Sequence, residues 1–179
     1  MNYRLFGKSG LRVSELCLGT MTFGTEWGWG ADKAESQRIF DTFTNKGGNF
    51  LDTANRYTEG ASERFLGEFI KSERHHFVVA SKYTLRDQTG DLNFAGSHRK
   101  NMMRSVEESL RRLDTEFIDL LWVHAWDGTT PIDEILRNTP HRFPFLLIDR
   151  IDLVEEYDPA GEFRRSAMWL LRLRSEAKI

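Results

Sequence analysis

The chain has 179 residues and a net charge of −2 at pH 7, and 40% of its residues are hydrophobic. This length suits one domain with a substantial core, and the balanced charge leaves no electrostatic footprint for nucleic acid or an anionic membrane. The single cysteine, Cys17, excludes an intramolecular disulfide and a multi-cysteine metal site. No apolar run approaches the roughly 18 residues of a membrane span, and the polar N-terminus has no signal core. We therefore expect a cytoplasmic protein that binds neither nucleic acid nor membrane.

The first predicted element is a short β-hairpin in "YRLFGKSGLRV", with Lys8-Ser9-Gly10 in the turn. Short apolar runs follow it at residues 13–21, 49–53, 77–83 and 117–126. Runs of this kind are typical of strands that are buried on both faces, as in parallel sheets.

Segments with helical periodicity separate these runs. Asp32, followed three residues later by Glu35, predicts the start of one helix, and Ser62 is the expected N-cap of the next. The helices are expected near residues 33–46, 62–71 and 98–113, and a further one opens at "TTPIDEILR". Because strands alternate with helices, the sequence predicts βαβ units and an α/β fold with a parallel sheet.

The alternation stops after residue 137. Pro140 and Pro144 interrupt any helix, and "FLLIDRIDLVEEY" fits either a strand or a helix. The last residues fit a terminal helix. We therefore divide the chain into residues 1–137, with four βα units behind a hairpin, and an atypical tail over residues 138–179.

Chemically capable residues fall at the ends of the predicted strands. Parallel strands deliver their last residues to one edge, which holds the active site in β/α barrels and open α/β sheets. The residues delivered there are Gly19-Thr20, Asp52, Tyr57, Lys82 and His124. A phenol donates protons weakly near neutral pH, a nearby ammonium assists it, and a neutral imidazole can orient a substrate oxygen. The set suits protonation of a carbonyl oxygen, while hydride must come from a cofactor.

Each of these residues also has a structural explanation when taken alone. Lys82 could snorkel at a strand end, His124 could pack in the core, and Asp52 could cap a loop. Their coincidence at the ends of successive strands favours a shared site. Asp and His at strand ends could also bind metal, but the sequence has no H-x-H or H-E-x-x-H and a rim lysine repels a cation, so we expect no metal.

Four stretches resemble the aldo-keto reductase family: "GLRVSELCLGTMTFG", "NFLDTANRYTEGASERFLGEFI", "FVVASKY" and "LLWVHAWD". The resemblance covers residues 1 to about 137. It implies the N-terminal half of a (β/α)8 TIM barrel and an enzyme that reduces aldehydes or ketones with NADPH, with NADH as the alternative cofactor. The family has no Rossmann fold, and this chain accordingly contains no G-x-G-x-x-G motif.

The resemblance also implies a role for each residue at the strand ends. Tyr57 would be the general acid, Lys82 would assist its proton release, and Asp52 would hold Lys82. His124 would position the carbonyl group of the substrate. These four residues would form the catalytic tetrad.

Cofactor and substrate contacts follow from the same resemblance. The nicotinamide end of the cofactor would lie near Gly19, Thr20, Met21 and Asp52. Trp27 and Trp126 stand where family members line the pocket for a small carbonyl substrate, with core or lid packing as the alternative.

Nothing in residues 138–179 resembles the later family segments that hold the cofactor. We therefore expect a truncated chain that binds NADPH weakly and has impaired activity. The alternative is a non-catalytic remnant or interaction protein that retains the half-barrel. The open edges of a half-barrel also favour pairing with a second copy, which predicts a homo-oligomer.

Overall fold

The computed structural model describes residues 1–7, 9–86 and 90–138. At its centre is a four-stranded sheet in the order β3-β4-β5-β6. Each strand pairs in parallel with the next one along the chain, which confirms the predicted parallel sheet. The strands are β3 (Cys17–Gly19), β4 (Phe50–Asp52), β5 (Val78–Tyr83) and β6 (Leu120–Val123).

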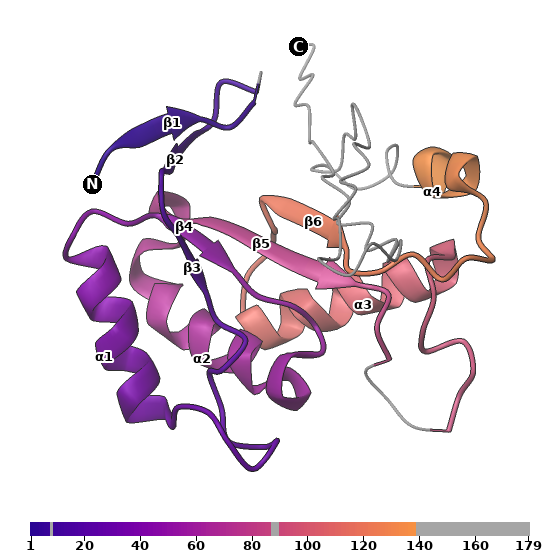
Figure 1. Cartoon of the computed structure of the whole chain (residues 1–179), viewed down its shortest axis with the longest axis horizontal. Helices are drawn as coiled ribbons and strands as arrows, with labels where there is room; N and C mark the ends of the chain where they lie inside the picture. Colours follow the sequence, from indigo (N-terminus) through magenta and orange to yellow (C-terminus); the bar gives the residue numbers. More distant parts are fainter. Residues whose placement is uncertain (8, 87–89, 139–179) are drawn as a thin grey trace, which may run out of the picture.

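The helices that connect these strands all lie on one face of the sheet (Figure 1). Strands in chain order with helical crossovers on one side form a partial β/α barrel, as predicted. The helices are α1 (Lys33–Thr44), α2 (Ala61–Ile70) and α3 (Arg99–Leu113), with 3₁₀ segments η1 (Tyr57–Gly60) and η2 (Lys71–His76), and α4 (Ile132–Asn138) follows β6. The strand or helix and the terminal helix expected in the tail lie outside the described residues. No described helix is long and apolar enough to cross a membrane.

The predicted hairpin is confirmed. Strands β1 (Tyr3–Leu5) and β2 (Arg12–Ser14) pair antiparallel and lie on the other side of the sheet from the helices (Figure 1). The apolar run predicted as one strand over residues 13–21 is divided between β2 and β3. The division has a local cause. The Ser14 backbone N–H donates to the Asn49 side chain at 2.7 Å, and the Ser14 hydroxyl donates to the Leu16 carbonyl at 2.7 Å, which turns the chain between the two strands.

Alternation along β5 assigns its side chains to the two faces of the sheet. Val79 packs with the helices, whereas Val78 and Ala80 belong to the cluster on the hairpin side. Lys82 continues the series of Val78 and Ala80, because residues two apart on a strand share a face. Asp52 pairs in register with Ala80 on the adjacent strand. Both charged residues therefore stand at the carboxyl ends of strands on the face away from the helices.

The starts of the helices follow the sequence only in part. Asp32 caps α1 as predicted, accepting the Glu35 backbone N–H at 2.8 Å. The prediction that Ser62 caps α2 is wrong, because the N-cap is Gly60, whose φ of 81° turns the chain into the helix. Ser62 is fully buried within α2, and its hydroxyl donates to the Thr20 carbonyl at 2.8 Å. It thus joins the end of β3 to α2.

Candidate active site

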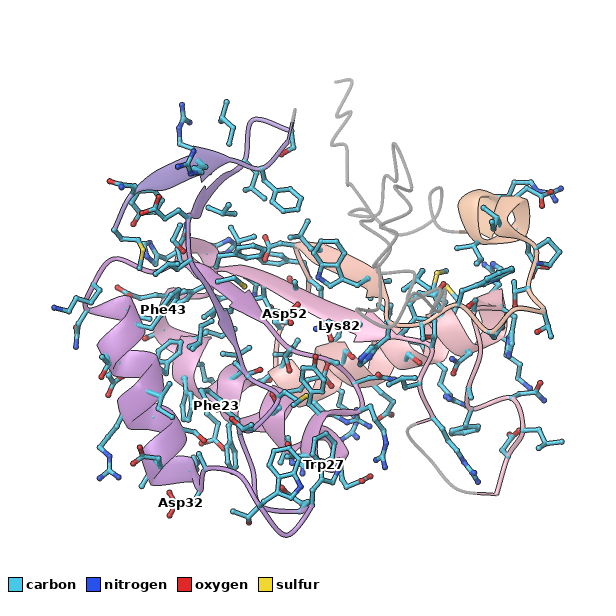
Figure 2. All side chains as sticks on the ribbon, in the orientation of Figure 1. Phe23, Trp27, Asp32, Phe43, Asp52 and Lys82 are labelled. Carbon is cyan, nitrogen blue, oxygen red and sulfur yellow. The ribbon has the colours of Figure 1, made fainter. Side chains whose placement is uncertain are left out.

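Lys82 lies at the centre of the site. Its ammonium pairs with the Asp52 carboxylate, which lies beside it in Figure 2, and donates to the Thr53 carbonyl at 2.9 Å and the Tyr57 hydroxyl at 3.1 Å. An ammonium has three N–H donors, so these three acceptors account for all of them. Only 9% of Lys82 is exposed. The lysine is therefore fixed in place and is not a snorkelling surface residue.

His124 completes the cluster from the residue after β6. Its ring stands perpendicular to that of Tyr57, with 5.8 Å between the ring centroids. Burial, and secondarily the nearby Lys82 ammonium, lower the pKa of His124 to about 4. The imidazole is therefore neutral at neutral pH. Its Nδ1 atom is buried and has no hydrogen-bond partner among the described residues.

Asp52 provides the charge that balances Lys82. Burial raises the pKa of Asp52, and the Lys82 ammonium acts against that shift. The Trp122 indole also favours the ionised carboxylate, although its nitrogen reaches no hydrogen-bonding geometry within the described part of the chain. A partly buried ion is tolerated when an opposite charge is in contact with it, so Asp52 and Lys82 each make the other possible at this position.

Tyr57 is presented by a strained loop. The two residues after it, Thr58 and Glu59, have φ angles of 45° and 53°, in the left-handed region that non-glycine residues rarely adopt. The Thr58 hydroxyl donates to the Phe23 carbonyl. The Trp27 indole donates to the Glu59 carboxylate at 3.1 Å and lies on the long loop between β3 and α1 (Figure 2). The structure therefore places Trp27 against the segment that bears Tyr57.

The residues expected near the nicotinamide differ in their accessibility. Gly19 is exposed, pairs in register with Asp52, and has no atom within 4 Å of the place where a side chain would begin. Met21 is also exposed. Thr20 is fully buried, and its hydroxyl is engaged with Ser62 and the Asp52 carbonyl. The Thr20 backbone N–H and carbonyl are engaged as well, so Thr20 supports the end of β3 from below and presents no exposed atom.

Trp126, two residues after His124, packs toward the helices. Its indole donates to the Thr130 carbonyl at 2.8 Å, and its ring packs against a buried cluster that includes Tyr83, Val106 and Ile135. This cluster lies between the sheet and helices α3 and α4. The contact is the one that the core-packing alternative predicts for Trp126.

Behind the site lies a buried ion pair that the sequence did not lead us to expect. Glu63 on α2 is fully buried, accepts the Ser81 hydroxyl at 2.7 Å, and pairs with Arg112 on α3 at 3.2 Å. A sequence signal for it exists. Glu63 shares the spacing of Leu66 and Ile70, so an acid occupies a position on the buried stripe of α2.

Metal ligands do not gather in the described part of the chain. No group of three or more His, Cys, Asp or Glu residues there could hold a metal ion. The site is instead an ion pair, a phenol and a neutral imidazole in contact. Such a set can donate a proton and orient an oxygen.

The chain is similar to known reductases and dehydrogenases. Residues 15–141 match the model of the aldo/keto reductase family. A norsolorinic acid reductase of Aspergillus flavus is 43% identical over 147 residues, which is 76% of this chain and 38% of that protein. An NADP(+) aryl-alcohol dehydrogenase of Phanerodontia chrysosporium is 41% identical over 141 residues, or 71% of this chain and 37% of that protein.

Solved structures agree with this assignment. The holo form of an aldo-keto reductase from Bacillus halodurans superimposes with a TM-score of 0.68 at 35% identity, over 78% of this chain and 45% of that one. The chain therefore spans less than half the length of these three proteins. The match of the family model over residues 15–141, together with these identities, shows that the chain belongs to the aldo/keto reductase family.

Proposed function

We propose that the chain reduces the carbonyl group of aldehydes or ketones to an alcohol with NADPH, and that Asp52, Tyr57, Lys82 and His124 carry the reaction. The observation that supports this most directly is the Lys82 ammonium, which joins the Asp52 carboxylate to the Tyr57 hydroxyl. The family supports a carbonyl reductase, and one relative is named for NADP(+).

The residues around the strand ends fit the nicotinamide end of NADPH. The open backbone at Gly19 allows close approach beside the ion pair. Gly19 and Met21 would hold that end of the cofactor, with Thr20 buried beneath them as support. When bound, NADPH supplies the hydride that no side chain can provide.

Tyr57 is the proposed proton donor. Its hydroxyl would pass a proton to the substrate oxygen as negative charge develops there. The Lys82 ammonium, at 3.1 Å from the phenol oxygen, stabilises the phenolate that remains. Asp52 keeps that ammonium in place and balances its charge. The proton therefore leaves Tyr57, whose phenolate the Lys82 ammonium already stabilises.

His124 is proposed to orient the carbonyl group. A neutral imidazole has one N–H donor and one acceptor nitrogen, so it can donate a hydrogen bond to the substrate oxygen without transferring its proton. Because the pKa of His124 is about 4, its ring stays neutral near neutral pH, where Tyr57 would donate its proton. The roles of proton donor and orienting donor are therefore separated.

The substrate class is proposed from the relatives and from Trp27. One relative is named an aryl-alcohol dehydrogenase. The rings of Trp27 and Trp29, on the loop beside Tyr57, are tilted against each other with 5.5 Å between their centroids. An aromatic surface next to the proton donor suits a small aromatic carbonyl compound. We further propose that the chain acts in the cytoplasm, where Cys17 would remain a free thiol.

Cofactor titration followed by turnover tests the proposal. The purified chain is titrated with NADPH up to millimolar concentration, because the sequence predicts weak binding, and oxidation of NADPH is then followed with benzaldehyde and related aldehydes. We expect saturable NADPH binding and slow oxidation that depends on the aldehyde. The alternative, a non-catalytic interaction protein that retains the half-barrel, predicts that neither is observed.

A further inference from the structure

We propose that Arg112 is a positioning residue that clamps the loop carrying Tyr57 and so holds the phenol against Lys82 and His124. Arg112 lies on α3, behind the sheet, and its guanidinium bonds to the Asn55 carbonyl and the Glu63 carboxylate. The inference deepens the proposed function and rests on it, because the position of Tyr57 matters for catalysis only if Tyr57 donates the proton.

The first contact of the clamp is with the chain before Tyr57. Nη1 of Arg112 donates to the Asn55 carbonyl at 2.9 Å, two residues upstream of the tyrosine. The same nitrogen pairs with the Glu63 carboxylate at 3.2 Å. One guanidinium therefore connects the loop to α2 and α3, the two helices behind it.

The second contact is with the chain after Tyr57. Gly60, three residues downstream, has a φ of 81°, and a Cβ there would lie 2.8 Å from Nε of Arg112 and 3.0 Å from its Cδ. The backbone at Gly60 thus packs directly on the guanidinium, with no room for a side chain between them. Arg112 holds the loop on both sides of Tyr57.

The loop needs such restraint because its own conformation is unfavourable. Thr58 and Glu59 both adopt left-handed backbone angles, which persist only when surrounding contacts impose them. The Thr58 hydroxyl, bonded to the Phe23 carbonyl, provides one contact from the loop after β3. Arg112 provides the other from α3, so the tyrosine is held between two fixed points.

The guanidinium is itself immobilised. Its side chain is 10% exposed, and its partner Glu63 is fully buried and also accepts the Ser81 hydroxyl at 2.7 Å. On the preceding turn of α3, Oε2 of Glu108 lies 3.9 Å from Nη2 of Arg112. A charge-assisted pair with this burial has few alternative geometries, so it transmits the position of the helices to the loop.

Histidine NMR of the full chain, without cofactor or substrate, tests the clamp. In the unaltered chain His124, assigned by its absence in His124→Gln, should titrate near pH 4, since it faces the Lys82 ammonium and the Tyr57 ring in a partly buried setting. In Arg112→Met we expect the loop to loosen and Tyr57 to leave the His124 ring. The His124 resonance should then lose its ring-current shift, and its midpoint should rise toward the ordinary value of about 6.5.

Arg74→Met is the matched control. Arg74 is also 10% exposed and pairs with Asp119 at 2.8 Å, and it donates to the Phe117 carbonyl at 2.8 Å, but it lies near the amino ends of the strands. The Arg74→Met substitution therefore removes a comparable buried guanidinium that has no contact with the loop carrying Tyr57. We expect the His124 midpoint and ring-current shift to stay unchanged in this variant.

Arg112→Lys covers the case in which Arg112→Met does not fold. Lysine keeps the positive charge near Glu63 but ends one bond short of Nη1, so a smaller displacement of the His124 titration in the same direction is expected. An unaltered His124 signal in the folded Arg112 variants would overturn the proposal, as would an equal change in Arg74→Met. Because no turnover is measured, failure of the clamp is distinguishable from failure of the proposed reductase activity.

Discussion

At the scale of single residues, the burial of Lys82 determines the character of the site. An ammonium that is 9% exposed must have acceptors, and it finds them in Asp52, the Thr53 carbonyl and the Tyr57 hydroxyl. Each acceptor lies on β4 or the loop that follows it. The same contacts that compensate for burying the charge therefore bring the phenol beside the lysine.

Tyr57→Phe should lower turnover by about 10²- to 10⁴-fold, the usual contribution of a positioned proton donor. Affinity for NADPH should change little, since only the hydroxyl is removed. Tyr3→Phe, which removes a phenol from the remote hairpin, is the control. Steady-state oxidation of NADPH with an aromatic aldehyde measures the effect. Equal losses in the two variants would remove Tyr57 from its proposed role.

His124 should make stability depend on pH in the acidic range. Its folded pKa, about 4, lies below the value of about 6.5 expected in the unfolded chain. Between these values the unfolded chain binds more protons, so stability should fall as pH is lowered from about 6.5 to about 4 and lose no more below that on this account. Urea unfolding at several pH values measures this. The His124→Gln variant should show a smaller decrease across that window, and an identical decrease would contradict the assignment.

At the scale of elements, close packing of α2 on α3 determines where the Glu63–Arg112 pair lies. Gly67 lies where a Cβ would meet the Leu113 carbonyl oxygen at 2.5 Å, so the helices touch there through backbone. One turn earlier on α2, Glu63 reaches across to Arg112. The loop that holds Tyr57 is thus supported by a helix contact that only glycine permits.

Gly67→Ala should therefore destabilise the fold by about 1–3 kcal/mol, because the added methyl group must push backbone atoms apart. The better helix propensity of alanine offsets at most about 1 kcal/mol of this cost. Glu68→Ala, on the exposed side of the same helix, loses only a surface pair with Lys33 and should cost less than about 1 kcal/mol. Chemical denaturation of both variants measures their free energies of unfolding. A stabilised Gly67→Ala would show that α2 and α3 are not in close contact.

At the scale of the whole molecule, the sheet is open within the described residues. There β3 pairs only with β4, and β6 pairs only with β5. Unpaired backbone along an edge strand favours pairing with another chain. The exposed Cys17 on β3 marks one such edge.

We therefore expect self-association at micromolar concentration, measured by analytical ultracentrifugation. Cys17→Lys should shift the equilibrium toward monomer, because lysine on an edge strand opposes pairing. Leu92→Lys removes an apolar side chain that is 97% exposed on a loop away from the sheet, and it should have no such effect. A chain that sediments as a monomer at every concentration would contradict this expectation.

Much of this arrangement is determined by local sequence. The period of the strands, the cap at Asp32 and the rule that parallel strands end at one edge suffice to predict the sheet, the helices and the convergence of Asp52, Tyr57, Lys82 and His124. These signals depend on residues close in sequence or on a rule common to all parallel sheets. They need no knowledge of which helix packs on which.

Only the tertiary structure decided the rest. Serine is a residue type that commonly caps helices, but Ser62 lies buried against Thr20. Of the two tryptophans expected at the pocket, Trp126 packs behind the sheet, whereas Trp27 contacts the segment that bears Tyr57. Glu63 and Arg112 are 49 residues apart in sequence and carry charge into a buried layer. The physical reason is that a polar side chain is buried only where partners from distant elements satisfy it, and those partners are set by how α2, α3 and the sheet pack together.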